Sequence, residues 1–130
     1  MNPPILIVDD DLDAREALRL RLSHAGFEAV TVGSGREAIE CYDALQPRIV
    51  FLDASMPEVS GFEVSRYIKD QELDPPATVI FVSGASSPTL DYVQRCAQIS
   101  GGDHFISKPY DWRTLVGLVR GIEECVVVAG

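Results

Sequence analysis

The sequence predicts an α/β protein in which helices cover both faces of a parallel sheet. Short apolar runs, suited to strands, alternate along the 130 residues with longer amphipathic segments suited to helices. Two of these runs, Ile5–Val8 and Ile49–Leu52, are apolar at every position. Strands of that kind are buried on both faces, as in the middle of a parallel sheet.

Length and composition are those of one globular domain. We expect a single domain over residues 1–130, with its core in about 4–124 and a tail or the start of a linker in 125–130. The net charge of −9 argues against direct contact with nucleic acid. Three scattered cysteines favour reduced thiols and a cytoplasmic location, and the sequence has no apolar stretch long enough to span a bilayer.

Each expected strand is an apolar or β-branched run that ends at a polar or turn residue. The expected strands span residues 5–8, 27–32, 49–53, 78–82 and 104–107. Gly33 ends the second of them, and the first and third lead directly into carboxylates.

The expected helices follow from apolar spacing and from residues that cap helix ends. Ser34 with Glu37 and Ser60 with Glu63 have the form of capping boxes, and Asp111 can cap the last helix. We expect helices over residues 12–25, between 34 and 47, between 60 and 74, from 87 to about 99, and after 111. The sequence alone leaves open whether the apolar tail after residue 125 starts a linker helix or packs on the sheet.

Three adjacent carboxylates, Asp9, Asp10 and Asp11, follow the first strand. They repel one another, so a fold that gathers them at a sheet edge recovers this cost by binding a cation. The alternative is that one of them caps the next helix and the others are only solvated, which is the commoner fate of a charge run.

Polar residues also end the later strands. Asp53 ends the third strand, Ser83 follows the fourth, and Lys108 follows the fifth. The carboxyl ends of parallel strands converge on one edge, where α/β sheets place their binding crevices. Clustered carboxylates, a hydroxyl and an ammonium group suit phosphoryl transfer, because its transition state spreads negative charge over oxygen atoms that need donors and cations.

Asp53 is the candidate for a covalent phosphate acceptor, since a carboxylate nucleophile can form an acyl phosphate. Mg²⁺ takes one or two carboxylates together with waters and phosphate oxygens. Asp10, Asp53 and the backbone carbonyl of Ser55 could supply its ligands, with Mn²⁺ as an alternative ion. Lys108 would pair with Asp53 or with the incoming phosphoryl oxygens, and Ser83 would donate a hydrogen bond to the phosphoryl group.

In their order and spacing, these residues resemble the receiver domains of two-component response regulators, the CheY-like superfamily. The resemblance extends from Ile5 to about Glu124. It implies a flavodoxin-like fold with a five-stranded sheet in the order 2-1-3-4-5. It rests on Asp9-Asp10, Asp53 followed by Met56-Pro57 and Gly61, Ser83, and Lys108-Pro109.

The resemblance implies that Asp53 accepts phosphate from a phosphohistidine of a sensor histidine kinase or a histidine phosphotransfer protein. Asp10 and Asp53 would bind Mg²⁺, and Asp9 would help through water. Such a domain is not a classical enzyme, because it catalyses only its own phosphorylation and dephosphorylation. It would act on a downstream output domain or protein, as a monomer or weak homodimer, without contacting a membrane.

The resemblance also implies a switch pair, Ser83 and Phe105. On phosphorylation the hydroxyl would move toward the phosphate and the ring would turn inward, which changes the surface around the fourth helix, fifth strand and fifth helix. Alternatively, Phe105 is a fixed core aromatic. The bond between Lys108 and Pro109 is implied to be cis, although the base rate for such bonds favours trans.

Two other functions fit part of the pattern. A protein-interaction module without phosphorylation would keep the fold, but it would gain nothing from the unfavourable charge cluster. A phosphatase of the haloacid dehalogenase type also uses a strand-end aspartate with Mg²⁺. Those enzymes, however, place a second aspartate where this chain has Ser55, and their nucleophile ends the first strand rather than the third.

Overall fold

The computed structural model describes residues 3–54, 60–71, 77–84 and 89–129. Side chains are described within these ranges except at 89–91 and 124–129.

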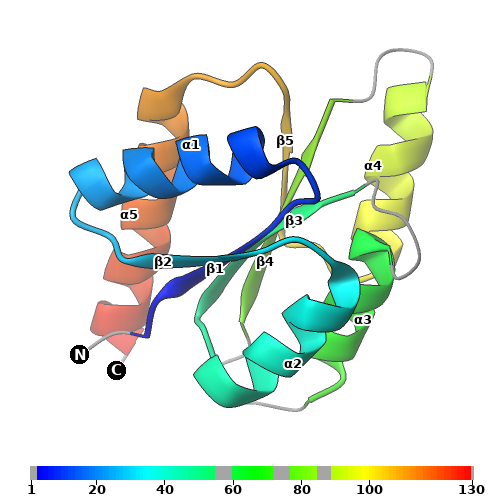
Figure 1. Ribbon diagram of the computed structural model, residues 1–130, viewed down its shortest axis with the longest axis horizontal. Coiled ribbons are helices and arrows are strands. Elements are labelled where there is room, and N and C mark those ends of the chain that lie inside the picture. The colour runs from blue at the N-terminus through cyan, green and yellow to red at the C-terminus, as the bar shows by residue number, and fades with distance from the viewer. Residues whose placement is uncertain (1–2, 55–59, 72–76, 85–88, 130) are drawn as a thin grey trace.

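Five parallel strands form a single sheet in the order β2-β1-β3-β4-β5, as the resemblance implied (Figure 1). The order places β1, β3 and β4 inside the sheet and leaves β2 and β5 at its edges. The strands are β1 (Ile5–Val8), β2 (Ala29–Val32), β3 (Ile49–Asp53), β4 (Thr78–Ser83) and β5 (His104–Ser107).

Helices alternate with the strands and cover both faces of the sheet. Helices α1 and α5 lie on one face, and α2, α3 and α4 lie on the other (Figure 1). The predicted caps at Ser34, Ser60 and Asp111 accept backbone N–H groups in the first turn of the helix that follows each. Of the three adjacent carboxylates, Asp11 is the one that caps α1. The helices are α1 (Leu12–His24), α2 (Gly35–Leu45), α3 (Gly61–Lys69), α4 (Thr89–Ile99) and α5 (Trp112–Ala129).

The prediction that the second strand begins at Phe27 is wrong by two residues, since β2 begins at Ala29. The backbone N–H of Phe27 donates to the carbonyl of Leu22 at 2.8 Å and so closes the end of α1. Gly26 makes this closure possible through its left-handed backbone, with φ of +93°. The helix end therefore takes residues that the apolar pattern assigned to the strand.

The core has two halves, one on each face of the sheet. Every residue of β1, and the first four of β3, are buried, which confirms the prediction of strands covered on both faces. On one face they pack against Ala38, Tyr42, Val64, Ile68 and Ala97. On the other they pack against Leu18, Leu22, Leu115 and Val119.

The backbone of the apolar tail is helical. Helix α5 continues through Val126–Ala129, so the tail adds no strand to the sheet. Among the residues that the structure describes, no helix is both long and apolar enough to cross a membrane.

An ion pair closes the amino edge of the sheet, where the strands begin. Lys69 Nζ, at the end of α3, lies 2.6 Å from Asp103 Oδ2 and also donates to the carbonyl of Ala77 at 2.7 Å. The same Asp103 oxygen accepts the backbone N–H of Val79 at 2.8 Å. These bonds tie α3 to the starts of β4 and β5.

Candidate functional site

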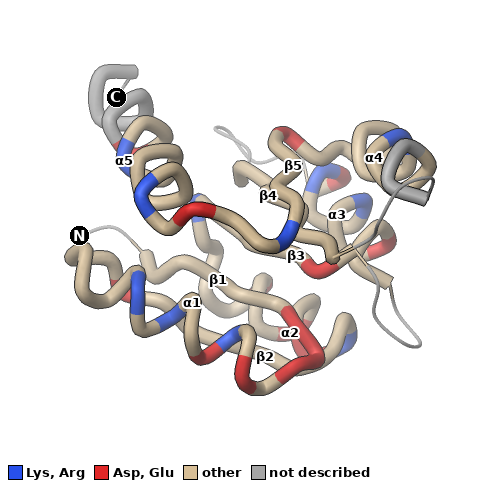
Figure 2. The backbone as a smooth tube through the Cα atoms, turned by 90° about the horizontal axis from the view of Figure 1, so that it is seen from above, with Lys and Arg blue, Asp and Glu red and all other residues tan. Residues whose placement is uncertain are grey.

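The carboxyl edge of the sheet gathers most of the predicted site residues. Asp9 follows β1, Asp53 and Ser83 end β3 and β4, and Lys108 follows β5. The strand register pairs Asp53 with Val82, so Asp53 and Ser83 reach the same edge. Figure 2 shows the acidic segment between β1 and α1 at this edge. The sequence argument that strand ends would bring these residues together is correct.

Three carboxylates meet there. Asp9, Asp10 and Asp53 each offer one oxygen, and these oxygens lie within 4.8 Å of one another. Oxygens on opposite sides of an octahedral Mg²⁺ are about 4.2 Å apart, given Mg–O distances of 2.0–2.1 Å. The donor set is all oxygen, so the spacing and the chemistry both fit a hard divalent cation. Ser55, the predicted third ligand, lies outside the described residues.

The three carboxylates differ in exposure. Asp9 is buried, with 7% of its surface exposed, Asp53 is half-buried, and Asp10 is exposed. Asp9 therefore lies on the protein side of the cation position, and Asp10 lies on its solvent side.

Asp9 is held at all four of its polar backbone and carboxylate atoms. Its N–H donates to the Val32 carbonyl at 3.2 Å, and its carbonyl accepts a hydrogen bond from Arg15 Nη1 at 3.0 Å. Its Oδ1 accepts the Asp11 N–H at 2.9 Å, and its Oδ2 lies 3.3 Å from Lys108 Nζ. Asp9 is therefore a fixed part of the site rather than a free carboxylate.

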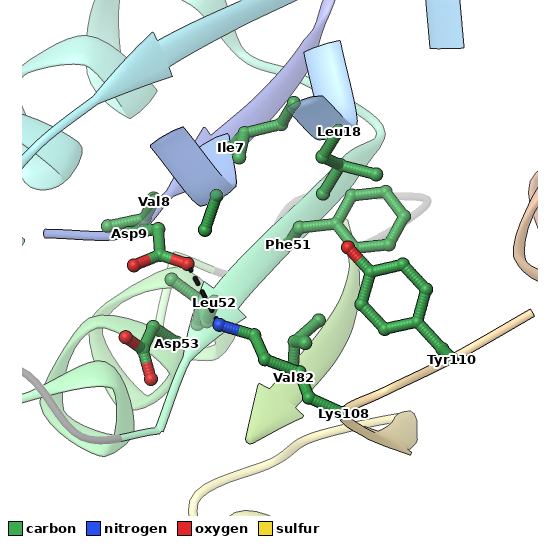
Figure 3. Close-up of a pocket in the computed structure, with 11 residues that line it drawn as sticks. Ile7, Val8, Asp9, Leu18, Phe51, Leu52, Asp53, Val82, Lys108 and Tyr110 are labelled. Carbon is green, nitrogen blue, oxygen red and sulfur yellow. Dashed lines mark hydrogen bonds and ion pairs between the residues drawn. The ribbon is translucent and has the colours of Figure 1, made fainter. Parts of the chain in front are cut away.

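Lys108 crosses from the end of β5 toward the carboxylates (Figure 3). The ion pair that the structure gives it is with Asp9, a partner that the sequence did not suggest. Its predicted pairing with Asp53 or with phosphoryl oxygens stays a prediction. The peptide bond between Lys108 and Pro109 is cis, as the resemblance implied.

An apolar floor closes the site from below. A cavity of about 10 Å³ lies beneath the carboxylates, between Leu18, Phe51 and Tyr110 (Figure 3). This volume holds about one water molecule. Burial, followed by the negative charge of Asp9, raises the pKa of Tyr110 and keeps its phenol protonated.

The proposed switch residues lie on neighbouring strands. Ser83 is buried, with 1% of its surface exposed, and pairs in register with Ser107, two residues after Phe105. Phe105 is half-buried and packs against the core on the α2–α4 face. This partial burial suits both a ring that turns and a ring fixed in the core.

Helix α3 begins in direct contact with the backbone of Asp53. A Cβ atom added at Gly61 would lie 2.2 Å from the Asp53 carbonyl oxygen. Only glycine allows this approach, which explains a glycine at the eighth position after Asp53 without giving it any chemistry.

Sequence reasoning missed Arg15, which it treated only as part of a helix. The one available signal was its place, one turn into α1 and six residues after Asp9. An arginine there can reach back to the strand end from which the helix starts.

Comparison with known proteins agrees with this geometry. The family model for the response regulator receiver domain matches residues 5–120. The DNA-binding response regulator MtrA of Mycobacterium tuberculosis (strain ATCC 25618 / H37Rv) is 32% identical over 120 residues, which are 92% of this chain and 50% of MtrA. The sensor histidine kinase AtsR of Burkholderia thailandensis is 34% identical over 122 residues, which are 88% of this chain and 19% of AtsR.

Among solved structures, the receiver domain of NtrX from Brucella abortus is 29% identical, with a TM-score of 0.81. The match covers 92% of this chain and 98% of that one. The chain thus spans about half the length of MtrA and nearly all of an isolated receiver domain. The protein therefore belongs to the response regulator receiver domain family and is a receiver domain of two-component signal transduction.

Proposed function

We propose that Asp53 is the phosphoacceptor of this receiver domain. The observation that supports it most is the meeting of Asp9, Asp10 and Asp53 at one sheet edge, with Lys108 beside them. An Asp53 carboxylate oxygen forms the new P–O bond as the P–N bond of a donor phosphohistidine breaks. The electron pair of the P–N bond stays on the imidazole, and later hydrolysis of the acyl phosphate restores the carboxylate.

Asp10 and Asp53 would hold Mg²⁺ together with the Ser55 carbonyl, and Asp9 would contribute through water. Mn²⁺ can replace Mg²⁺ at an all-oxygen site of this kind. When bound, the ion neutralises charge on the phosphoryl oxygens. Without it, three carboxylates repel an incoming phosphoryl group, so phosphorylation depends on the divalent cation.

Lys108 and Ser83 bind the phosphoryl oxygens after transfer. Lys108 extends toward both Asp9 and Asp53 (Figure 3), and a doubly charged phosphoryl group on Asp53 would attract its ammonium group more strongly than the Asp9 carboxylate does. Ser83 donates its hydroxyl proton to the same group. Movement of Ser83 makes room for Phe105 to turn inward, which changes the surface formed by α4, β5 and α5.

The phosphate donor is a sensor histidine kinase or a histidine phosphotransfer protein, and the phosphorylated surface acts on an output domain or protein. MtrA is described as DNA-binding and AtsR as a sensor histidine kinase, so relatives of both kinds carry this domain. With a net charge of −9, this domain leaves nucleic acid binding to a partner. It works in the cytoplasm as a monomer or weak homodimer.

Acetyl phosphate and Mg²⁺ test the proposal. The intact mass should rise by one phosphoryl group in the wild type and should stay unchanged in Asp53→Asn. Asp70→Asn is the matched control, since Asp70 is exposed at the far end of α3 and should leave phosphorylation unchanged.

An unchanged wild-type mass under these conditions would favour an interaction module without phosphorylation. Sustained hydrolysis of p-nitrophenyl phosphate would instead favour a phosphatase. A mass gain in Asp53→Asn would move the acceptor to another residue.

A further inference from the structure

We propose that Arg15 is a positioning residue of the cation site and that Gly33, because it has no side chain, leaves room for the Arg15 guanidinium. The two residues hold the backbone of Asp9, and through it the side chain of Asp10. This inference rests on the proposed function only in that it concerns the same Mg²⁺ site.

Arg15 reaches the site through the main chain. Its Nη1 donates to the carbonyl of Asp9 at 3.0 Å, while its own backbone N–H donates to the carbonyl of Asp11 at 3.1 Å in the first turn of α1. The guanidinium therefore bonds the peptide group that joins Asp9 to Asp10. It fixes the orientation of that peptide from the side of α1.

Gly33 provides the other side of this contact. A Cβ atom at position 33 would lie 2.4 Å from Arg15 Nη1 and 3.3 Å from Arg15 Cζ. The residue before it, Val32, accepts the Asp9 N–H at 3.2 Å. The end of β2 thus bonds Asp9 directly and also leaves the space in which Arg15 lies.

A second observation indicates that Arg15 is held in place at a cost. Its Nε is buried and has no hydrogen-bond partner within the described part of the chain. A buried donor without a partner is unfavourable, and an arginine on the surface of a helix could avoid it by turning into solvent. The bond to the Asp9 carbonyl holds the side chain in this position.

Asp10 depends on this arrangement more than Asp9 does. The carboxylate of Asp9 has bonds of its own to Asp11 and Lys108. Asp10 is exposed, and its side chain makes no hydrogen bond to any residue that the structure describes. The backbone at Asp9 and Asp10, which Arg15 and Gly33 hold, therefore sets the point from which its carboxylate reaches toward the cation position.

Titration of the full chain with MgCl₂ by calorimetry tests the inference. Arg15→Met removes the donor but keeps the length of the side chain, and we expect Mg²⁺ to bind roughly tenfold more weakly, as when other groups that orient metal ligands are removed. Gly33→Ala keeps Arg15 but displaces its guanidinium, so affinity should fall in the same direction. Arg15→Lys keeps one donor and should restore part of the affinity.

Two controls separate positioning from general damage. Arg19→Met removes a half-buried arginine one turn along α1 that pairs with Glu16 instead of the site. Gly117→Ala adds a Cβ atom where no other group lies within 4 Å. Both should bind Mg²⁺ as the wild type does, and urea unfolding of every variant should remain cooperative.

Unchanged Mg²⁺ affinity in both Arg15→Met and Gly33→Ala would overturn the inference and leave the role of Asp53 intact. Weaker binding that occurs only together with loss of cooperative unfolding would overturn it as well, because the role would then be structural. Failure of the wild type to take up phosphate while these affinity differences hold would overturn the proposed function alone. A wild type that binds no Mg²⁺ would overturn both.

Discussion

One lysine–aspartate ion pair lies where the strands begin, at the amino edge of the sheet, and another lies where they end, at the carboxyl edge. The two pairs have different surroundings. At the amino edge, Lys69 and Asp103 are 2.6 Å apart, and both also bond the backbone of β4 or the residue before it. At the carboxyl edge, Lys108 and Asp9 are 3.3 Å apart, beside two further carboxylates. The Lys69–Asp103 pair is balanced in charge, whereas the described groups around Lys108 and Asp9 have negative charge in excess.

This difference distinguishes an ion pair that holds the fold from one that belongs to a binding site. Lys69 and Asp103 balance each other's charge and each bonds the backbone, whereas Asp9 and Lys108 lie beside two further carboxylates that can hold a cation. Excess carboxylate charge costs stability in the unbound protein and becomes favourable only when a cation arrives. Four changes test this contrast.

Loss of the amino-edge lysine should have the largest effect on stability. Lys69→Met leaves Asp103 without its ion-pair partner and removes a donor to the Ala77 carbonyl, so the free energy of unfolding should fall by about 1–2 kcal/mol. Urea denaturation measures it. Asp103→Asn keeps an acceptor for the Val79 N–H and should cost less, and both variants should still be phosphorylated at Asp53. A stability unchanged in Lys69→Met would show that this pair does not hold the edge.

Mg²⁺ should stabilise the wild type through the carboxyl edge. At an ion concentration ten times the dissociation constant, the free energy of unfolding should rise by about 1.4 kcal/mol, because the ion binds only the folded chain. Thermal unfolding with and without MgCl₂ at constant ionic strength measures the change. Asp53→Asn should lose this stabilisation while Asp70→Asn keeps it, and an equal response in both would place the ion elsewhere.

Removal of one excess charge should raise stability when no divalent cation is present. Asp10→Asn takes away repulsion from Asp9 and Asp53, so in EDTA the free energy of unfolding should rise by about 1 kcal/mol. Urea denaturation in EDTA gives the value, and added Mg²⁺ should reverse the order of the two proteins. A less stable Asp10→Asn would contradict the idea that these charges oppose folding.

The smallest effect should appear at high pH, through Tyr110. Burial and the nearby Asp9 charge raise the pKa of Tyr110 in the folded protein. The unfolded chain releases the phenol proton first, near pH 10, so the stability that Tyr110 contributes is complete below that pH and is lost as pH rises through the folded pKa. Stability measured between pH 9 and 11 should fall less in Tyr110→Phe than in the wild type. An equal fall would mean that the phenol does not titrate differently on folding.

Much of the fold follows from the sequence, because strand burial and helix capping depend on neighbouring residues. The apolar runs predicted β1 and β3, and Ser34 and Ser60 predicted where α2 and α3 begin. The predicted start of β2 was wrong because Phe27 bonds back to Leu22, and this bond depends on how α1 ends.

The candidate site could be predicted only as far as strand ends determine it. Parallel strands must deliver Asp9, Asp53 and Lys108 to one edge, and they do. The hydrogen bonds of individual side chains could not be predicted in this way. Lys108 with Asp9, and Arg15 with the Asp9 carbonyl, depend on the angle at which helices and loops leave the sheet, which no periodic pattern records.

Two of the close-packed glycines, Gly61 and Gly33, should behave differently in a library of random variants selected for signalling. At Gly61 the obstacle to a side chain is the backbone of Asp53, which has no room to move, so we expect the selection to accept glycine alone. At Gly33 the obstacle is the end of the Arg15 side chain, which can turn away. Survivors there should include other small residues with graded responses to magnesium supply. Gly61 would look essential although it carries no reactive group. Substitutions at Gly33 would adjust how strongly signalling depends on magnesium.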